Sequence, residues 1–69
     1  MAFDQRYVRY ALTKIDNGRV RIYDSPMNYQ TIFTENAVFA IWAYDVVNVY
    51  LADGSIRRYD DFNHYQLIF

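Results

Sequence analysis

The chain has 69 residues, a net charge of −1 and no cysteine. This charge gives no general attraction to nucleic acid, and it is not the strong acidity of a DNA mimic. The lack of cysteine excludes a disulfide scaffold, a zinc finger and a thiol enzyme. Hydrophobic residues make up 54% of the chain and aromatic residues 20%, so a short chain can still bury a core. We expect one small β-rich domain over residues 1–69.

No segment of the sequence predicts membrane insertion. Residues 1–6 lack the apolar core of a signal peptide. The longest uncharged apolar run, Ala37 to Tyr44, is far shorter than a membrane span. The sequence therefore predicts a soluble cytoplasmic protein with no membrane partner.

The first predicted element is a β-hairpin over residues 8–23. Apolar residues recur at every second position on both sides of Asn17-Gly18, the period that marks half-buried strands. Asn-Gly between two such runs is among the strongest short-range signals for a hairpin turn. The alternating apolar residues are Val8, Tyr10, Leu12, Val20 and Ile22.

Two registers of this hairpin are possible. A two-residue turn at Asn17-Gly18 pairs Ile15 with Val20, whereas a three-residue loop pairs Lys14 with Val20. We favour the three-residue loop, because it separates the apolar side chains from the Arg and Tyr side chains. The resulting polar face contains Tyr7, Arg9, Arg19, Arg21 and Tyr23, with Lys14 or Arg6 at its margins.

The middle of the chain is less regular. Pro26 ends the hairpin, because proline cannot donate to a strand ladder. Residues 27–36 are expected to form a loop with a short strand or turn around Tyr29–Phe33. Residues 37–51 fit a helical stripe as well as a strand. Their β-branched and aromatic content favours strand, with a bend or break near Asp45.

Asp53-Gly54 predicts a second hairpin turn. A two-residue loop there pairs Leu51 with Ile56. Residues 61–69 fit either a short helix or a final strand, and we favour the strand.

The predicted fold is mainly β, either a small curled antiparallel sheet or an SH3-like barrel of about five strands, with room for one short helix. Truncation of Phe39 or Trp42 to Ala is expected to cost ~3–5 kcal/mol, because both are assigned to the core. The expected core consists of Val8, Tyr10, Leu12, Val20, Ile22, Phe39, Ile41, Trp42, Val47, Val49, Leu51, Ile56 and Leu67.

Catalytic and metal chemistry find little support in the sequence. A Ser-His-Asp triad would need His64 beside Ser25 or Ser55, and both serines fit turns. Asp60, Asp61 and His64 offer three ligands, but structural metal sites usually need four and adjacent aspartates are commoner in caps and turns. We therefore predict no enzyme activity, no cofactor and no metal site.

The predicted face of Tyr7, Arg9, Arg19, Arg21 and Tyr23 is the candidate binding site. Arg with Tyr is typical of protein interfaces, and also of surfaces that stack bases and neutralise phosphates. A solvated sheet face with Arg stems over Tyr rings has the same composition. We expect a non-enzymatic protein-binding module, an accessory or inhibitor protein of the kind frequent in phages and plasmids. The alternative is a small β-barrel that binds single-stranded nucleic acid or a nucleotide.

Self-association is a separate expectation. Surplus apolar area, open sheet edges and an apolar end at Ile68 and Phe69 all favour pairing with a copy of the same chain. We expect a homodimer or a higher homo-oligomer.

Overall fold

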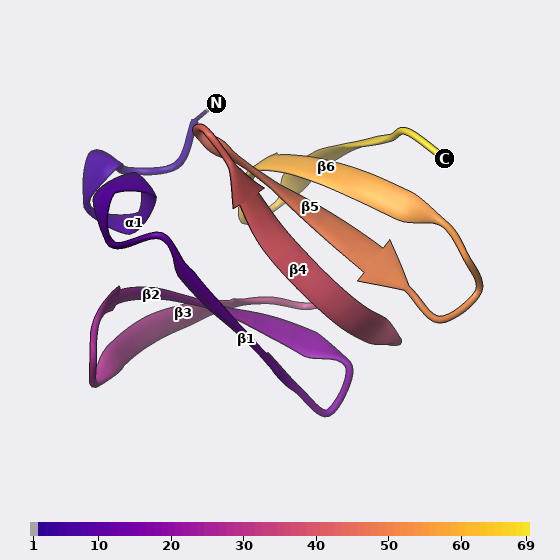
Figure 1. The fold of residues 1–69 in the computed structure, drawn as a ribbon, viewed down its shortest axis with the longest axis horizontal. Helices are drawn as coiled ribbons and strands as arrows, with labels where there is room; N and C mark the ends of the chain where they lie inside the picture. Colours follow the sequence, from indigo (N-terminus) through magenta and orange to yellow (C-terminus); the bar gives the residue numbers. More distant parts are fainter. Residues whose placement is uncertain (1) are drawn as a thin grey trace.

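The computed structural model describes residues 2–69. Within these residues the chain forms one short helix and seven strands, arranged as a three-stranded and a four-stranded antiparallel sheet (Figure 1). The mainly β prediction is confirmed, although the expected strand number was lower and the two sheets do not close into a barrel. The elements are α1 (Gln5–Tyr10), β1 (Leu12–Asp16), β2 (Arg19–Ser25), β3 (Asn28–Ile32), β4 (Ala37–Ala43), β5 (Val46–Leu51), β6 (Ile56–Asp61) and β7 (His64–Leu67).

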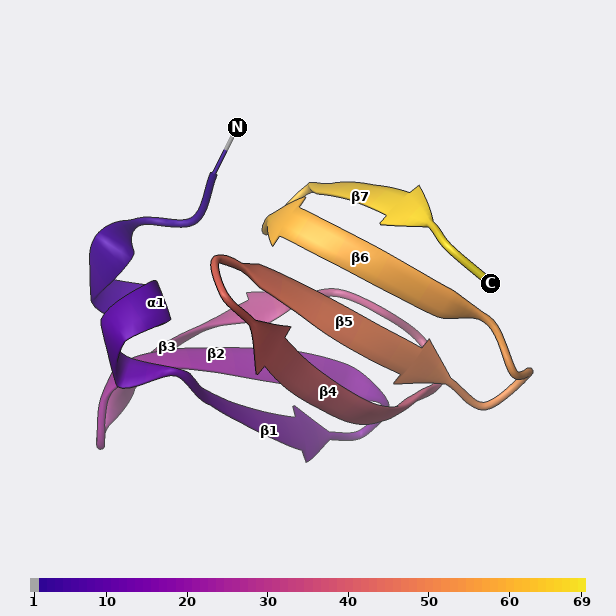
Figure 2. The ribbon, with the colours of Figure 1, turned by 45° about the horizontal axis from the view of Figure 1, so that its top comes forward.

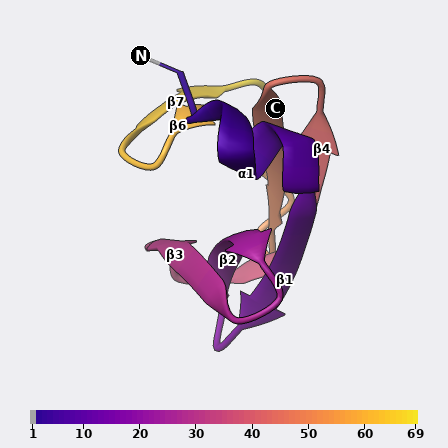
Figure 3. The same ribbon diagram turned by 90° about the vertical axis from the view of Figure 1, so that its left-hand side faces the viewer.

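The two sheets meet along one side and diverge on the other. The first sheet has the strand order β1-β2-β3 and the second has the order β4-β5-β6-β7. The Thr13 hydroxyl on β1 donates to the Ala40 carbonyl on β4 at 2.9 Å, and the Ala37 N–H donates to the Gly18 carbonyl at 3.0 Å. Figure 3 shows β1 close to β4, while β3 and the β6–β7 hairpin lie apart. The interior is open on this side, where a hollow lined by Ile32, Tyr59 and Tyr65 lies between β3 and the β6–β7 hairpin.

Helix α1 replaces the first half of the strand that the sequence predicted. Asp4 accepts from the Arg6 N–H at 3.0 Å at its start, and Ala11 ends it in the left-handed conformation with φ of 54°. The prediction of a strand at residues 8–11 is wrong. A short run of alternating residues is also compatible with a helical turn. Burial of Tyr7 beside Phe3 in the core favours the helix here.

The first hairpin has the two-residue turn, so the three-residue loop that we favoured is wrong. Ile15 pairs with Val20, and both Asn17 and Gly18 have positive φ, at 53° and 76°. Two positive φ angles define a type I′ turn, whose twist matches that of the flanking strands. Asn and Gly both tolerate this conformation, which decides the register.

The second hairpin has the longer loop, so its predicted pairing is also wrong by one residue. Tyr50 pairs with Ile56, and the Leu51 N–H donates to the Ser55 carbonyl at 2.9 Å. Within the loop only Gly54 has a positive φ, of 92°. The Asp53 carboxylate accepts from the Ser55 N–H at 2.9 Å and from its hydroxyl at 2.6 Å. These bonds stabilise a three-residue loop with one left-handed glycine.

The strand predictions for the rest of the chain are confirmed. Residues 37–51 form β4 and β5, and the break between them falls at Tyr44-Asp45. The segment around Tyr29 forms β3, and β7 is the final strand. These segments are rich in β-branched and aromatic residues, which pack well on a pleated surface.

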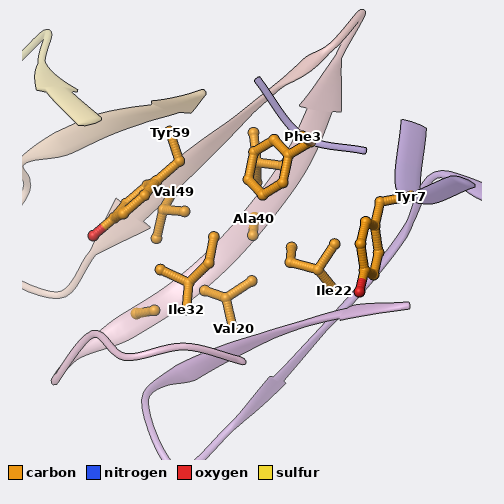
Figure 4. Close-up of a cluster of buried hydrophobic side chains, with 10 residues drawn as sticks. Phe3, Tyr7, Val20, Ile22, Ile32, Ala40, Val49 and Tyr59 are labelled. Atoms are coloured by element: carbon orange, nitrogen blue, oxygen red, sulfur yellow. The ribbon is translucent and has the colours of Figure 1, made fainter. Parts of the chain in front are cut away.

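The core lies between the two sheets, and α1 covers one end of it. Figure 4 shows Phe3 and Tyr7 pointing toward the side chains of β2, β4 and β5. Contacts between the sheets therefore bury the apolar faces of both. The buried cluster consists of Phe3, Tyr7, Val20, Ile22, Ile32, Ala37, Ala40, Val47, Val49 and Tyr59.

The predicted core is correct for the central strands and wrong at the edges. Val20, Ile22, Val47 and Val49 are fully buried. A bulge in β4 between Ala37 and Phe39 puts one extra residue in the strand, so Ala40 points inward and Phe39 outward. Val8, Leu12, Trp42, Leu51 and Ile56 are half-buried. The predicted core residues that are exposed instead are Tyr10, Phe39, Ile41 and Leu67.

Candidate binding surface

The outer face of the first sheet gathers cationic and aromatic side chains. Residues directly opposite one another in antiparallel strands share a face. Lys14 lies opposite Arg21, Asp16 opposite Arg19, and Tyr29 opposite Tyr23. We call this surface the cation–aromatic face, and its members are Lys14, Arg19, Arg21, Tyr23 and Tyr29.

Arg21 is the centre of this face. Its guanidinium carbon lies 4.5 Å from the Tyr29 ring centroid, and its Nη2 lies 2.9 Å from Oδ2 of Asp16. A hydrogen bond to the Tyr23 hydroxyl and, to a smaller extent, the negative charge of the Asp16 carboxylate raise the pKa of Arg21. The guanidinium therefore stays charged and is oriented by the chain itself.

The two rings of the face are already in contact with cations and with each other. The Lys14 Nζ lies 5.7 Å from the Tyr23 ring centroid, and the Tyr23 and Tyr29 centroids are 5.1 Å apart. Tyr23 is buried by these neighbours, whereas Tyr29 remains partly exposed. Cation–ring contacts of this kind are electrostatically favourable and restrict both partners. The face is thus assembled before any partner arrives.

A shallow hollow of about 170 Å³ lies on this face, lined by Asp16, Arg19, Arg21, Tyr29 and Thr31. Pockets for drug-sized ligands usually measure roughly 300–1,000 Å³. The hollow is therefore suited to a single side chain, and the two guanidiniums beside it favour a carboxylate.

Two residues of the predicted site lie elsewhere. Tyr7 is on α1 and only 3% exposed, with the Arg6 guanidinium 5.0 Å from its ring centroid. Arg9 is exposed on the last turn of the same helix. The structure brings together Arg19, Arg21 and Tyr23 but not Tyr7 or Arg9.

Sequence reasoning missed Tyr29 as a member of the face and placed Lys14 only at its margin. Lys14 would have been assigned to it by the two-residue turn, which places Lys14 opposite Arg21. Tyr29 lies in the segment that carried no clear pattern. Its pairing with Tyr23 depends on a third strand that returns after Pro26.

A second hollowed surface lies on the open side of the interior. Two adjoining hollows of about 340 and 320 Å³ share Phe33 and Arg57 among their lining residues. The Arg57 Nη1 donates to the Tyr59 hydroxyl at 3.1 Å, which raises the pKa of Arg57, and its guanidinium lies 4.6 Å from the Tyr65 centroid. Arg57 is thus held by its own neighbours, as Arg21 is on the other sheet.

The residues considered as metal ligands do not form a cluster. His64 Nδ1 lies 2.6 Å from Oδ1 of Asp60. Within residues 2–69, no group of three or more His, Asp or Glu side chains is arranged to hold a metal ion. Asp61 instead accepts from the Phe62 N–H at 2.9 Å in the turn between β6 and β7.

Comparisons of this chain with family models, with curated proteins and with solved structures gave no match. In the part of the chain that the structure describes, no helix is long and apolar enough to cross a membrane. Any indication of function therefore comes from the geometry of the chain's own surfaces.

Proposed function

We propose that the protein is a non-enzymatic binding module, an accessory or inhibitor protein, whose cation–aromatic face docks on an acidic surface of a partner protein. The supporting observation is the arrangement of Arg21, which stacks on Tyr29 and pairs with Asp16. Side chains that are ordered before binding lose less conformational entropy when the partner arrives. Arg and Tyr are also the residue types that most often dominate the energy of protein interfaces.

The state of the tyrosine rings favours a protein partner over a nucleic acid. Proteins that bind single strands stack successive bases on open aromatic faces. Here Lys14 lies over Tyr23, which is buried, and Arg21 lies over Tyr29. Base stacking would have to displace these cations, whereas a carboxylate could approach them from the side.

Charge defines the chemistry of the expected partner. Lys14, Arg19 and Arg21 share the face with one carboxylate, Asp16, although the whole chain has a net charge of −1. The hollow beside Arg19 and Arg21 has room for one side chain. An Asp or Glu of the partner would form charge-assisted hydrogen bonds there.

The test reverses the charges of the face. Arg19→Glu with Arg21→Glu is compared with Arg9→Glu and Arg58→Glu, two exposed arginines outside the face that give the same change in net charge. Immobilised wild-type protein captures partners from a lysate of the native source, and the affinity for a purified partner is then measured by calorimetry. Because a single hot-spot arginine contributes ~2 kcal/mol or more, we expect at least a roughly 30-fold loss for the face variant. The control variant should bind as the wild type does.

Two results would contradict this proposal. One is a partner that binds both double variants as tightly as the wild type. The other is tight binding of a fluorescent oligothymidylate that falls steeply with added salt and is lost in the Arg19→Glu, Arg21→Glu variant. The second result would replace the protein partner with single-stranded nucleic acid.

A further inference from the structure

Strand β7 is a free edge of the second sheet. Figure 2 shows it outside β6, on the side away from β5. Its residues, His64–Leu67, are all exposed. Proteins usually protect exposed edges with Lys, Pro, bulges or inward charges. Residues 64–69 contain no Pro, Lys, Arg, Asp or Glu, so neither charge nor proline protects this edge, and the bulge in its pairing with β6 lies at its start, between Tyr59 and Asp61.

The hydrogen-bond pattern identifies which backbone groups of this edge are free. The Ile68 N–H donates to the Ile56 carbonyl at 2.9 Å, so the backbone of Ile68 faces β6. Backbone groups along an antiparallel strand alternate in direction. Gln66 therefore also faces β6, and the N–H and C=O groups of Tyr65 and Leu67 point away from the sheet.

We propose that β7 pairs antiparallel with β7 of a second copy about a two-fold axis through Gln66. In this register Tyr65 of one protomer lies opposite Leu67 of the other, and the two Gln66 residues face each other. Each Tyr65–Leu67 pair exchanges both of its backbone hydrogen bonds. The free donors and acceptors of both residues are all used, and the second sheet continues from one protomer into the other.

The side chains around this axis suit a second copy. Tyr65 and Leu67 are on the same face as Tyr59 and Arg57, so each new Tyr65–Leu67 pair joins an aromatic to an aliphatic side chain. Leu67 is 66% exposed, so it loses contact with water on pairing. The new strand pair brings no like charges directly opposite each other, because β7 carries no Lys, Arg, Asp or Glu.

The edge formed by β3 is less suited to pairing. Its outer face belongs to the cation–aromatic face, so a β3–β3 pair would place the cations of two copies on one surface. Thr31 at its centre is also half-buried, so less apolar area is covered. Repulsion and smaller burial both favour β7.

Single cysteines test the register directly, because the chain has no cysteine of its own. In a non-hydrogen-bonded antiparallel pair the Cα atoms lie about 4.5 Å apart, within the roughly 4.4–6.8 Å that a disulfide spans. We therefore expect Gln66→Cys to form a disulfide-linked dimer in mild oxidant. Gln30→Cys, at the equivalent place on β3, and Leu67→Cys should remain largely monomeric. In the proposed register the two Leu67 residues are diagonal neighbours, about 7–8 Å apart.

A second test removes the free donor. Leu67→Pro deletes an N–H that points away from β6, so the β6–β7 ladder and the fold should persist. Thr31→Pro is the matched control. The two-residue turn fixes which residues of β2 bond to β1, and the alternate residues bond to Gln30 and Ile32 of β3. The N–H of Thr31 therefore points away from the sheet, as that of Leu67 does. At high micromolar concentration, sedimentation should give a dimer for the wild type and for Thr31→Pro, and a monomer for Leu67→Pro. A thermal melt checks that each variant is folded.

A monomeric wild type at high micromolar concentration would overturn the proposal. The proposal would also be overturned if the Gln66→Cys variant formed cross-links no faster than Gln30→Cys or Leu67→Cys. Faster cross-linking of Gln30→Cys would place the interface on β3. The cation–aromatic face lies on the other sheet, so failure of this dimer leaves the proposed partner binding intact. Conversely, loss of partner binding in the Arg19→Glu, Arg21→Glu variant leaves the dimer intact.

Discussion

At the scale of single residues, two glycines with similar backbone angles have different surroundings. Gly18 and Gly54 both have positive φ, at 76° and 92°. A Cβ on Gly18 would lie 2.6 Å from the Glu35 carbonyl oxygen, whereas a Cβ on Gly54 would meet nothing within 4 Å. The Gly18 carbonyl also accepts from the Thr34 hydroxyl at 2.6 Å. Gly18 is therefore the point where the first hairpin turn packs against the connection between β3 and β4.

This difference predicts unequal costs for the same substitution. Gly54→Ala should lose about 1–2 kcal/mol, the cost of a left-handed conformation in an L-residue. Gly18→Ala should lose roughly 1–3 kcal/mol more, because the new methyl group forces the backbone of Glu35 to move. Urea denaturation of both variants measures the two free energies of unfolding. Equal losses would show that the close approach at Gly18 does not contribute to stability.

At the scale of elements, the chemistry of one side chain selects the length of each hairpin loop. Asn17 adopts a positive φ and gives a two-residue turn. Asp53 instead accepts two hydrogen bonds from Ser55 and gives a three-residue loop. Both sequences contain a dipeptide ending in Gly, and the turn signal alone does not distinguish them. Because side chains alternate along a strand, a one-residue difference in loop length exchanges the faces of the sheet to which the side chains of the following strand point.

The Asp53 loop gives a pH-dependent prediction. Hydrogen bonds from the Ser55 hydroxyl and then from its N–H lower the pKa of Asp53 from its usual 3.8. The carboxylate therefore stabilises the hairpin above the unfolded pKa, and this contribution is lost as the pH falls through the folded pKa. Ser55→Ala should raise the pKa of Asp53 toward 3.8 in an NMR titration. The pKa of Asp60, lowered chiefly by a hydrogen bond with His64, should stay unchanged and serves as the control.

At the scale of the whole molecule, the segment before β1 completes the core. The ring of Phe3 contacts those of Trp42 and Phe62 at centroid distances of 5.2 and 5.0 Å, and Tyr7 contacts Phe62 at 5.3 Å. These edge-to-face contacts join the N-terminal segment to β4 and to the turn between β6 and β7. The two sheets alone would leave this end of the interior open.

Truncation of two phenylalanines measures where the core lies. Phe3→Ala should cost ~3–5 kcal/mol, because Phe3 is buried against the rings of Trp42 and Phe62, which cannot close the space left behind. Phe39→Ala should cost only about 1 kcal/mol, since Phe39 is 52% exposed on the outer face of the second sheet. This value replaces the larger cost expected from the sequence. Thermal or urea denaturation distinguishes the two, and a larger loss for Phe39→Ala would contradict the assignment of the core.

The sequence by itself determined the features that depend on local pattern. Alternating and β-branched residues predict the mainly β class, the strands within residues 37–51 and the positions of both Gly-containing turns. The spacing of Arg19, Arg21 and Tyr23 at every second position also places them on one face of one strand. These results follow because strand period and turn preference are properties of neighbouring residues.

Only the tertiary structure decided which residues share a surface. The helix at Gln5–Tyr10 and the bulge after Ala37 depend on contacts between residues far apart in the chain. These contacts include Phe3 with Trp42 and Gly18 with Glu35. Such contacts decide which side chains of a strand point inward and which point outward, and local preference alone does not determine this. For this reason Tyr29 joined the cation–aromatic face, while Tyr7 moved into the core.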